Sequence, residues 1–241
     1  MTQRLAGRNA LITGGTRGIG LAIAVAYARE GAAVALLSRG PENLGNACET
    51  VLAKAEGAKV TAVRAHVDDL AEVETAVQRA IEALGHLDIL VNSAGRGLPG
   101  DIDEMPPDVW ERIVRVNLLG TYFATRAVWP HFRERGGGVV INLSSGSGRR
   151  AHAGWSAYCA GKFGVMGLTD ALQKEGHPLG IRVNVICPGP TDTDQRRANF
   201  PDEDRKTLLR PEHVARVAVF LASDEARWVG GPGIDVRREP I

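Results

Sequence analysis

Short apolar runs alternate with longer amphipathic stretches along the whole chain. The runs are rich in aliphatic and β-branched residues, which is typical of strands buried on both faces. We predict strands at Ala10–Thr13, Ala33–Leu37, Val60–Ala65, Leu87–Val91, Val139–Leu143, Ile181–Ile186 and Ile234–Val236. The stretches between them carry apolar residues three or four positions apart, and we predict helices at Gly18–Arg29, Glu42–Ala55, Leu70–Leu84, Asp108–Arg133, Ala157–Glu175 and Glu212–Ala222.

Regular alternation of strand and helix indicates βαβ units, whose parallel strands are covered by helices on both faces. We therefore predict an α/β fold: a single-domain, doubly wound parallel β-sheet of the Rossmann type, with about seven strands. A chain of 241 residues with 44% hydrophobic residues fills one large core, so this domain is expected to span 1–241. The longest irregular stretch, Pro188 to Arg210, is polar, and we expect a short substrate lid at about 190–210.

Charge and cysteine content narrow the choice of partners. The 29 basic and 28 acidic side chains leave a formal net charge of +1, which offers no electrostatic footprint for nucleic acid or an anionic membrane. The N-terminal apolar run is too short for a signal peptide, and we find no apolar stretch of about 20 residues to cross a bilayer. Cys48, Cys159 and Cys187 lack the spacing of a disulfide framework or a metal site, so a reducing, cytoplasmic location is expected.

A glycine-rich turn follows the first predicted strand. Its sequence is Thr13-Gly14-Gly15-Thr16-Arg17-Gly18-Ile19-Gly20, and it leads directly into a helix. Glycine lets the backbone approach a pyrophosphate closely, and a helix N-terminus directs free N–H groups and a partial positive charge at the anion. A turn that binds nothing is the alternative, but the position at the start of the first βα unit favours a dinucleotide site.

Tyr158 and Lys162 lie four residues apart in a predicted helix, so their side chains project from one face. Ser145 follows the strand Val139–Leu143, at the carboxyl edge of the sheet where α/β proteins form their sites. A free tyrosine has a pKa of about 10, and neighbouring positive charge lowers it toward the range in which the phenol exchanges a proton with substrate. An ordinary amphipathic helix face is the alternative explanation of the pair.

Several motifs follow one another in a characteristic order: TGGTRGIG at 13–20, NSAG at 92–95, Asn117, Ser145, Tyr158 with Lys162, and Pro188-Gly189. In this order and spacing, nearly the whole chain resembles the short-chain dehydrogenase/reductase family. The resemblance implies transfer of the pro-S hydride between a nicotinamide dinucleotide and a carbonyl or secondary alcohol. It also implies the catalytic roles: Tyr158 exchanges the proton, Ser145 binds the substrate oxygen, Lys162 binds the ribose, and Asn117 sits in a backbone distortion that holds water beside Lys162.

The end of the second strand favours NADP(H) over NAD(H). Ser38 stands where NAD-dependent relatives usually have Asp, so no carboxylate repels a 2′-phosphate there. Arg39 follows with a guanidinium suited to phosphate, and Arg17 approaches from the glycine turn. A solvated surface charge is the better explanation of either arginine alone, but the two together, without a competing carboxylate, favour NADPH. The glycine turn and the resemblance together give these cofactor-binding residues: Gly14, Thr16, Arg17, Gly18, Ile19, Gly20, Ser38, Arg39, His66, Val67, Asn92, Ala94, Gly95, Tyr158, Lys162, Pro188, Gly189, Thr191 and Thr193.

His66 departs from the family, which commonly has Asp or Asn near the adenine; it either contacts the base or is solvated. Asp69 is predicted as a helix N-cap, with Glu72 three residues later. Substrate identity is expected in Gly146–Trp155 and in the segment from Asp194 to Arg210. Three basic residues in the first of these segments either meet an acidic substrate or are solvated: Arg149, Arg150 and His152.

Three functions are compatible with these residues. The leading one is a ketoreductase or alcohol dehydrogenase acting on a small molecule, and the second is a 3-oxoacyl-carrier-protein reductase. A non-catalytic dinucleotide sensor or scaffold is the third, and the presence of Ser145, Tyr158 and Lys162 together argues against it.

We also expect a homo-oligomer, a dimer or a tetramer. The predicted helices Asp108–Arg133 and Ala157–Glu175 carry more apolar residues than one sheet face covers, and members of the family pair these two helices about a two-fold axis. Burial of all these residues within the subunit is the alternative. They are Leu118, Leu119, Phe123, Val128, Phe163 and Met166.

Overall fold

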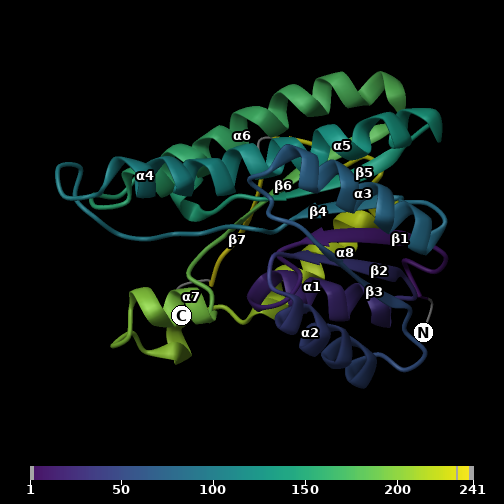
Figure 1. Cartoon of the computed structure of the whole chain (residues 1–241), viewed down its shortest axis with the longest axis horizontal. Coiled ribbons are helices and arrows are strands. Elements are labelled where there is room, and N and C mark those ends of the chain that lie inside the picture. Colours follow the sequence, from purple (N-terminus) through teal and green to yellow (C-terminus); the bar gives the residue numbers. More distant parts are fainter. Residues whose placement is uncertain (1–2, 232, 239–241) are drawn as a thin grey trace.

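The computed structural model contains one seven-stranded parallel sheet, in the order β3-β2-β1-β4-β5-β6-β7 (Figure 1). It describes residues 3–231 and 233–238. The strands are β1 (Asn9–Thr13), β2 (Ala33–Ser38), β3 (Val60–Arg64), β4 (Ile89–Asn92), β5 (Gly138–Leu143), β6 (Ile181–Pro188) and β7 (Ile234–Val236). The predicted doubly wound α/β fold is confirmed, and the strand ends differ from the prediction by at most two residues.

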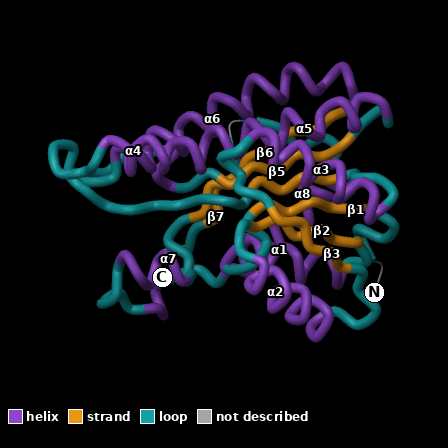
Figure 2. Tube along the Cα trace, in the orientation of Figure 1, coloured by secondary structure: helices purple, strands orange, loops and turns teal. Residues whose placement is uncertain are grey.

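Helices cover both faces of this sheet (Figure 2). They are α1 (Gly18–Arg29), α2 (Pro41–Lys54), α3 (Leu70–Leu84), α4 (Pro107–Val114), α5 (Gly120–Glu134), α6 (Ser156–Gly176), α7 (Asp194–Asn199) and α8 (Pro211–Ala222). Side chains alternate between the two faces along a strand. Ile12 of β1 therefore packs among residues of α1, α2 and α8, whereas the adjacent Leu11 packs among residues of α3 and α5.

Two predictions about the connecting segments need correction. The long helix expected over Asp108–Arg133 is divided into α4 and α5 by a π-helical turn, Arg115–Leu119, which turns Asn117 into the fully buried interior. The stretch from Pro188 to Arg210, expected to be irregular, contains α7. The Thr193 hydroxyl caps this helix by accepting a hydrogen bond from the Arg196 N–H at 3.2 Å.

The strand order places the predicted site segments together. From β1 the chain adds β2 and β3 on one side and then crosses back to place β4 on the other side of β1. Such a reversal of strand order opens a crevice at the carboxyl ends of the strands. Thr13 at the end of β1 is in register with Leu37 of β2 and with Asn92 of β4. The glycine turn, the Ser38-Arg39 pair and the segments after β4, β5 and β6 all emerge at this edge.

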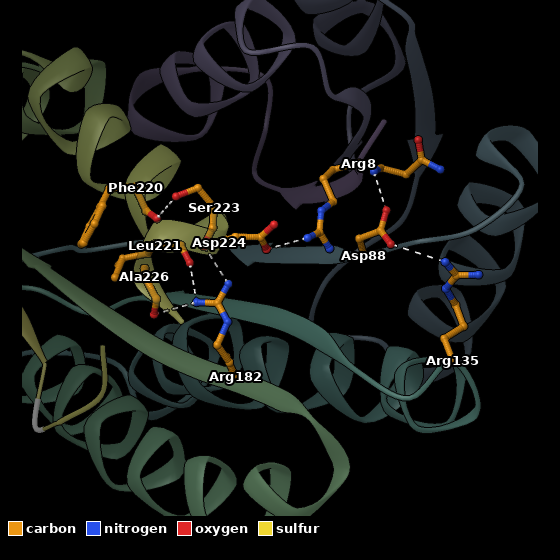
Figure 3. Close-up of polar contacts among 10 residues, drawn as sticks. Arg8, Asp88, Arg135, Arg182, Phe220, Leu221, Ser223, Asp224 and Ala226 are labelled. Carbon is orange, nitrogen blue, oxygen red and sulfur yellow. Dashed lines mark hydrogen bonds and ion pairs between the residues drawn. The ribbon is translucent and has the colours of Figure 1, made fainter. Parts of the chain in front are cut away.

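Arg182 binds the end of α8 at the opposite edge of the sheet (Figure 3). It lies near the start of β6, and its guanidinium donates to the backbone carbonyls of Leu221 at 2.9 Å, Ser223 at 3.0 Å and Ala226 at 3.2 Å. Carbonyls at a helix C-terminus have no partner within the helix, so these bonds complete α8. Burial lowers the pKa of Arg182 below its usual range.

Charged pairs continue along the same edge in Figure 3. Arg8 meets Asp224 at 2.7 Å, and Asp88 accepts from the Asn9 N–H at 2.8 Å while lying 3.5 Å from Arg135. These contacts therefore join helices and loops at the amino ends of the strands, whereas the crevice lies at the carboxyl ends.

The apolar residues on the π-helical turn, α5 and α6 divide between core and surface. Val128, which we expected in a subunit interface, is fully buried within the subunit and packs in the core. Phe163 of α6 is 44% exposed, and Tyr122 of α5 is 41% exposed. Leu118, Leu119, Phe123 and Met166 are half-buried.

Candidate active site

The glycine turn packs against the segment after β4. Gly14 has a φ of +65°, which side chains rarely tolerate, and a Cβ there would meet the Ala94 Cα at 2.7 Å. A Cβ on Gly20 would collide with the carbonyl of Gly14. Glycine at these positions therefore lets the turn pack closely on the segment after β4, and the turn and the N-terminus of α1 line the crevice.

A cavity of about 640 Å³ extends from this turn to α6. Most residues predicted to bind the cofactor line it. They are Gly14, Thr16, Arg17, Gly18, Ile19, Gly20, Ser38, Arg39, His66, Val67, Ala94, Gly95, Tyr158, Lys162, Pro188 and Thr193. The predicted residues outside its lining are Asn92, Gly189 and Thr191, and the last two line a neighbouring cavity.

The Asn92 side chain is buried on the face of the sheet covered by α5 and α6. It donates to the Thr125 hydroxyl at 3.0 Å and to the Asn142 side-chain oxygen at 2.9 Å. Asn142 in turn donates to the Thr169 hydroxyl at 2.9 Å, so the network joins β4 and β5 to both helices. The Asn92 side chain therefore joins the strands that carry the site to the helices behind them, and the role of Asn92 in cofactor binding stays a prediction.

Basic side chains surround the end of β2. The Ser38 hydroxyl accepts a hydrogen bond from Thr16 at 3.4 Å, while Arg17 and Arg39 line the cavity. Arg64, at the end of β3, donates to the Arg39 carbonyl at 3.2 Å and was not singled out by the sequence patterns. The carboxylates among the described lining residues, Asp68 and Asp194, follow β3 and β6 rather than β2.

His66 lines the other wall of this corner and is fixed by the first turn of α3. Its Nδ1 lies 2.9 Å from a Glu72 carboxylate oxygen, which also accepts from the His66 N–H at 2.8 Å. These hydrogen bonds lower the pKa of Glu72. The predicted N-cap is confirmed, because Asp69 accepts from the Glu72 N–H at 3.0 Å.

Tyr158, Ser145 and Lys162 meet where β5 and α6 come together. Lys162 is 4% exposed, its Nζ donates to the Leu143 carbonyl at 2.8 Å, and the same Nζ lies 5.6 Å from the centre of the Tyr158 ring. Burial lowers the pKa of Lys162 to about 8. Burial also raises the pKa of Tyr158, while a hydrogen bond with Ser145 and the charge of Arg196 oppose that rise.

The sign of the Tyr158 shift differs from our expectation. Nearby positive charge was predicted to lower this pKa, but burial of the phenol raises it by more than the Ser145 hydrogen bond and the charge of Arg196 lower it. The phenol therefore holds its proton at neutral pH, which is the state required of a proton donor.

Asn117 completes the arrangement from the π-helical turn. Its side-chain NH₂ donates to the Arg96 carbonyl at 2.6 Å and to the Ile113 carbonyl at 2.8 Å, and its Oδ1 is buried without a hydrogen-bond partner in the described structure. Gly95 lies between this oxygen and Lys162: a Cβ there would be 3.0 Å from the Oδ1 and 3.5 Å from the Nζ. The backbone distortion that the resemblance implies is present at this residue.

A second cavity, of about 470 Å³, opens on the other side of Tyr158. Ser145 and the Gly146–Trp155 segment form one wall, and α7 with Phe200 forms another. The sequence did not decide whether three basic residues meet the substrate or solvent. His152 lines this cavity. Arg149 instead donates to the Gly233 carbonyl at 2.7 Å and pairs with Asp235 at 3.3 Å. Arg150 is exposed and outside the lining.

This geometry agrees with comparisons to known proteins. The family model for short chain dehydrogenases matches residues 8–204, and the chain belongs to this family of oxidoreductases. It is 38% identical over 241 residues to an acetoacetyl-CoA reductase of Rhizobium meliloti (strain 1021), covering 94% of this chain and 95% of the relative. It is also 38% identical over 248 residues to a 3beta-hydroxysteroid dehydrogenase 2 of Eggerthella lenta, covering 96% and 94%.

Solved structures give the same result. The crystal structure of levodione reductase superimposes with a TM-score of 0.92 at 31% sequence identity, over 97% of both chains.

None of the helices described in our structure is long and apolar enough to cross a membrane. No group of three or more His, Cys, Asp or Glu side chains suited to a metal ion occurs among the described residues.

Proposed function

We propose that the protein is an NADPH-preferring reductase of small ketones, a reaction that runs in reverse as alcohol oxidation. The observation that carries the proposal is the junction of two cavities at Tyr158, with Ser145 and Lys162 beside it. A nicotinamide dinucleotide supplies the hydride when bound. The glycine turn at the N-terminus of α1, which side chains on Gly14 and Gly20 would disrupt, is suited to its pyrophosphate.

Four side chains bind the substrate and cofactor and transfer the proton. Ser145 donates a hydrogen bond to the substrate oxygen, and Tyr158 gives its proton to that oxygen as negative charge develops there. Lys162 holds ribose hydroxyls from within the cavity, and its positive charge favours the phenolate that remains after proton transfer. The buried Asn117 Oδ1 is an acceptor suited to a water that returns the proton by way of Lys162.

The charges at the end of β2 support NADPH over NADH. Arg17 and Arg39 reach the corner at which a 2′-phosphate is attached, and Ser38 supplies a hydroxyl rather than a repelling carboxylate. Arg64 adds a third positive charge beside Arg39.

The free Cys48, Cys159 and Cys187 are consistent with a reducing cytoplasm as the place of action.

Reduction of a 3-oxoacyl thioester is a second candidate. It is favoured by the acetoacetyl-CoA reductase relative, which matches over almost the whole chain. The segment from Asp194 to Arg210, with α7 inside it, is proposed as the lid over either substrate.

A substrate panel tests the proposal. Oxidation of NADPH and NADH is followed with simple ketones, aldehydes, cyclic ketones and acetoacetyl-CoA. We expect turnover of at least one carbonyl substrate with a higher kcat/KM for NADPH. Dinucleotide binding without turnover of any member would instead support a sensor or scaffold.

A further inference from the structure

A column of stacked groups connects the lid to the catalytic tyrosine. The Arg196 guanidinium lies 3.7 Å above the centre of the Phe200 ring, and that ring is stacked with Trp155 at 5.7 Å between centroids and 12° between planes. Trp155 meets the Tyr158 ring edge to face at 5.9 Å. Aromatic contacts of these kinds are favourable beyond the area they bury, so the four groups hold one another in place.

The same wall is bound to the segment after β4. Gly97 donates its N–H to the Gln195 side-chain oxygen at 3.1 Å, and its carbonyl accepts from the Asn199 side chain at 3.1 Å. A Cβ on Gly97 would lie 3.1 Å from Trp155 and 3.2 Å from Tyr158. Both amides come from α7, so the helix and the two aromatic rings are positioned by one short stretch of backbone.

The wall is neutral although it contains an arginine. Glu203 accepts from the Arg196 Nε at 2.6 Å and from its Nη2 at 2.5 Å, a bidentate pair that lowers the pKa of Glu203. The other ionisable side chains on the described lining of this cavity are Tyr158 and His152. A negatively charged substrate group would therefore find the nearest guanidinium already occupied.

We propose that Trp155, Phe200 and the neutralised Arg196 form the specificity-determining wall of the substrate cavity and select uncharged ketones that carry a flat ring beside the carbonyl. The inference rests on the proposed ketone reduction. Flat, rigid rings are covered efficiently by other flat groups and lose little conformational freedom on binding. A carboxylate placed against the wall is desolvated without gaining a free cation, which disfavours it.

Matched substrates test the charge preference. The protein is assayed with NADPH and acetophenone, para-acetylbenzoate or butanone. We expect a kcat/KM for acetophenone at least about tenfold above that for para-acetylbenzoate. Equal or higher efficiency on the carboxylate would overturn the inference while leaving ketone reduction established. If no carbonyl compound is reduced, the proposed function itself fails.

Variants of the wall separate recognition from general damage. Trp155→Leu is expected to lower kcat/KM for acetophenone about tenfold more than it lowers kcat/KM for butanone, and Trp155→Phe should restore most of this difference. Trp228→Leu is the matched control, because Trp228 is 87% exposed and outside both cavities. An equal loss on both ketones would overturn the role of Trp155 in specificity.

The ion pair provides an independent test. Glu203→Gln removes the negative charge that neutralises Arg196, so the ratio of kcat/KM for acetophenone to kcat/KM for para-acetylbenzoate should fall at least about fivefold. An unchanged preference in a folded variant that still reduces acetophenone would contradict the proposed neutralisation of the wall. Circular dichroism and NADPH binding verify the fold of each variant.

Discussion

The Lys162 Nζ lies 5.6 Å from the centre of the Tyr158 ring and donates to the Leu143 carbonyl at 2.8 Å. The carbonyl of Leu143 in β5 therefore positions the Lys162 ammonium beside Tyr158, the candidate proton donor. The spacing of four residues places both side chains on one face of α6, and the hydrogen bond at the end of β5 orients the lysine side chain.

Tyr158→Phe should reduce turnover severely without abolishing cofactor binding. The ring and its contact with Trp155 are kept, but the proton donor is lost, so kcat should fall by about two to four orders of magnitude. Steady-state assays measure the loss, and fluorescence titration measures NADPH binding. Near-normal turnover in this variant would show that another group donates the proton.

Lys162 should make folding stability depend on pH in a defined window. The folded protein releases the Lys162 proton near pH 8, whereas the unfolded chain retains it until about 10.5. Because the unfolded state binds more protons between these values, stability of the wild type relative to Lys162→Met should rise with pH there, by about 1 kcal/mol per pH unit. Chemical denaturation of both proteins across this range measures the difference, and a flat or falling difference would contradict the shift.

Arg39→Asp should move cofactor preference toward NADH. The new carboxylate repels a 2′-phosphate and accepts a hydrogen bond from a ribose hydroxyl, so the kcat/KM ratio of NADPH to NADH should fall at least about tenfold. Arg79→Asp, on the exposed side of α3 and outside the cavity lining, reproduces the change in charge as a control. An unchanged ratio for Arg39→Asp would place the phosphate elsewhere.

We predict a dimer or tetramer in solution, formed through the exposed apolar face around Tyr122 and Phe163. Phe163→Arg should shift the mass measured by light scattering toward the 25.7 kDa of one chain, because a charge is then buried in the interface. Leu52→Arg, at a residue of α2 that is 51% exposed, should leave the assembly intact. A wild-type mass of one chain at micromolar concentration would contradict the prediction.

The sheet and much of the cofactor crevice were predictable because their signals are local. Parallel strands leave continuous apolar runs, and the glycine turn stands directly between a strand and a helix. The place of Asn92 was also encoded, since alternation along β4 puts it on the same face as Leu90, which packs among residues of α3 and α5.

The substrate wall was not predictable in the same way. α7 has six residues, too few to establish a helical period, and Trp155 and Phe200 are brought together only by the complete fold.

The π-helical turn at Asn117 has no hydrophobic period that would distinguish it from the helices on either side, so the sequence pattern there is continuously helical. Burial of Tyr158 likewise depends on distant segments, so the direction of its pKa shift required the structure.

Isotope transfer tests the central claim most directly. The protein is supplied with NADPH deuterated at the pro-S position of C4 and with the best ketone of the panel, and the alcohol product is examined by mass spectrometry. We predict one deuterium on the carbinol carbon of the alcohol, in wild type and in the residual product of Tyr158→Phe. Alcohol formed by the wild type without deuterium at that carbon would contradict direct pro-S hydride transfer in this site.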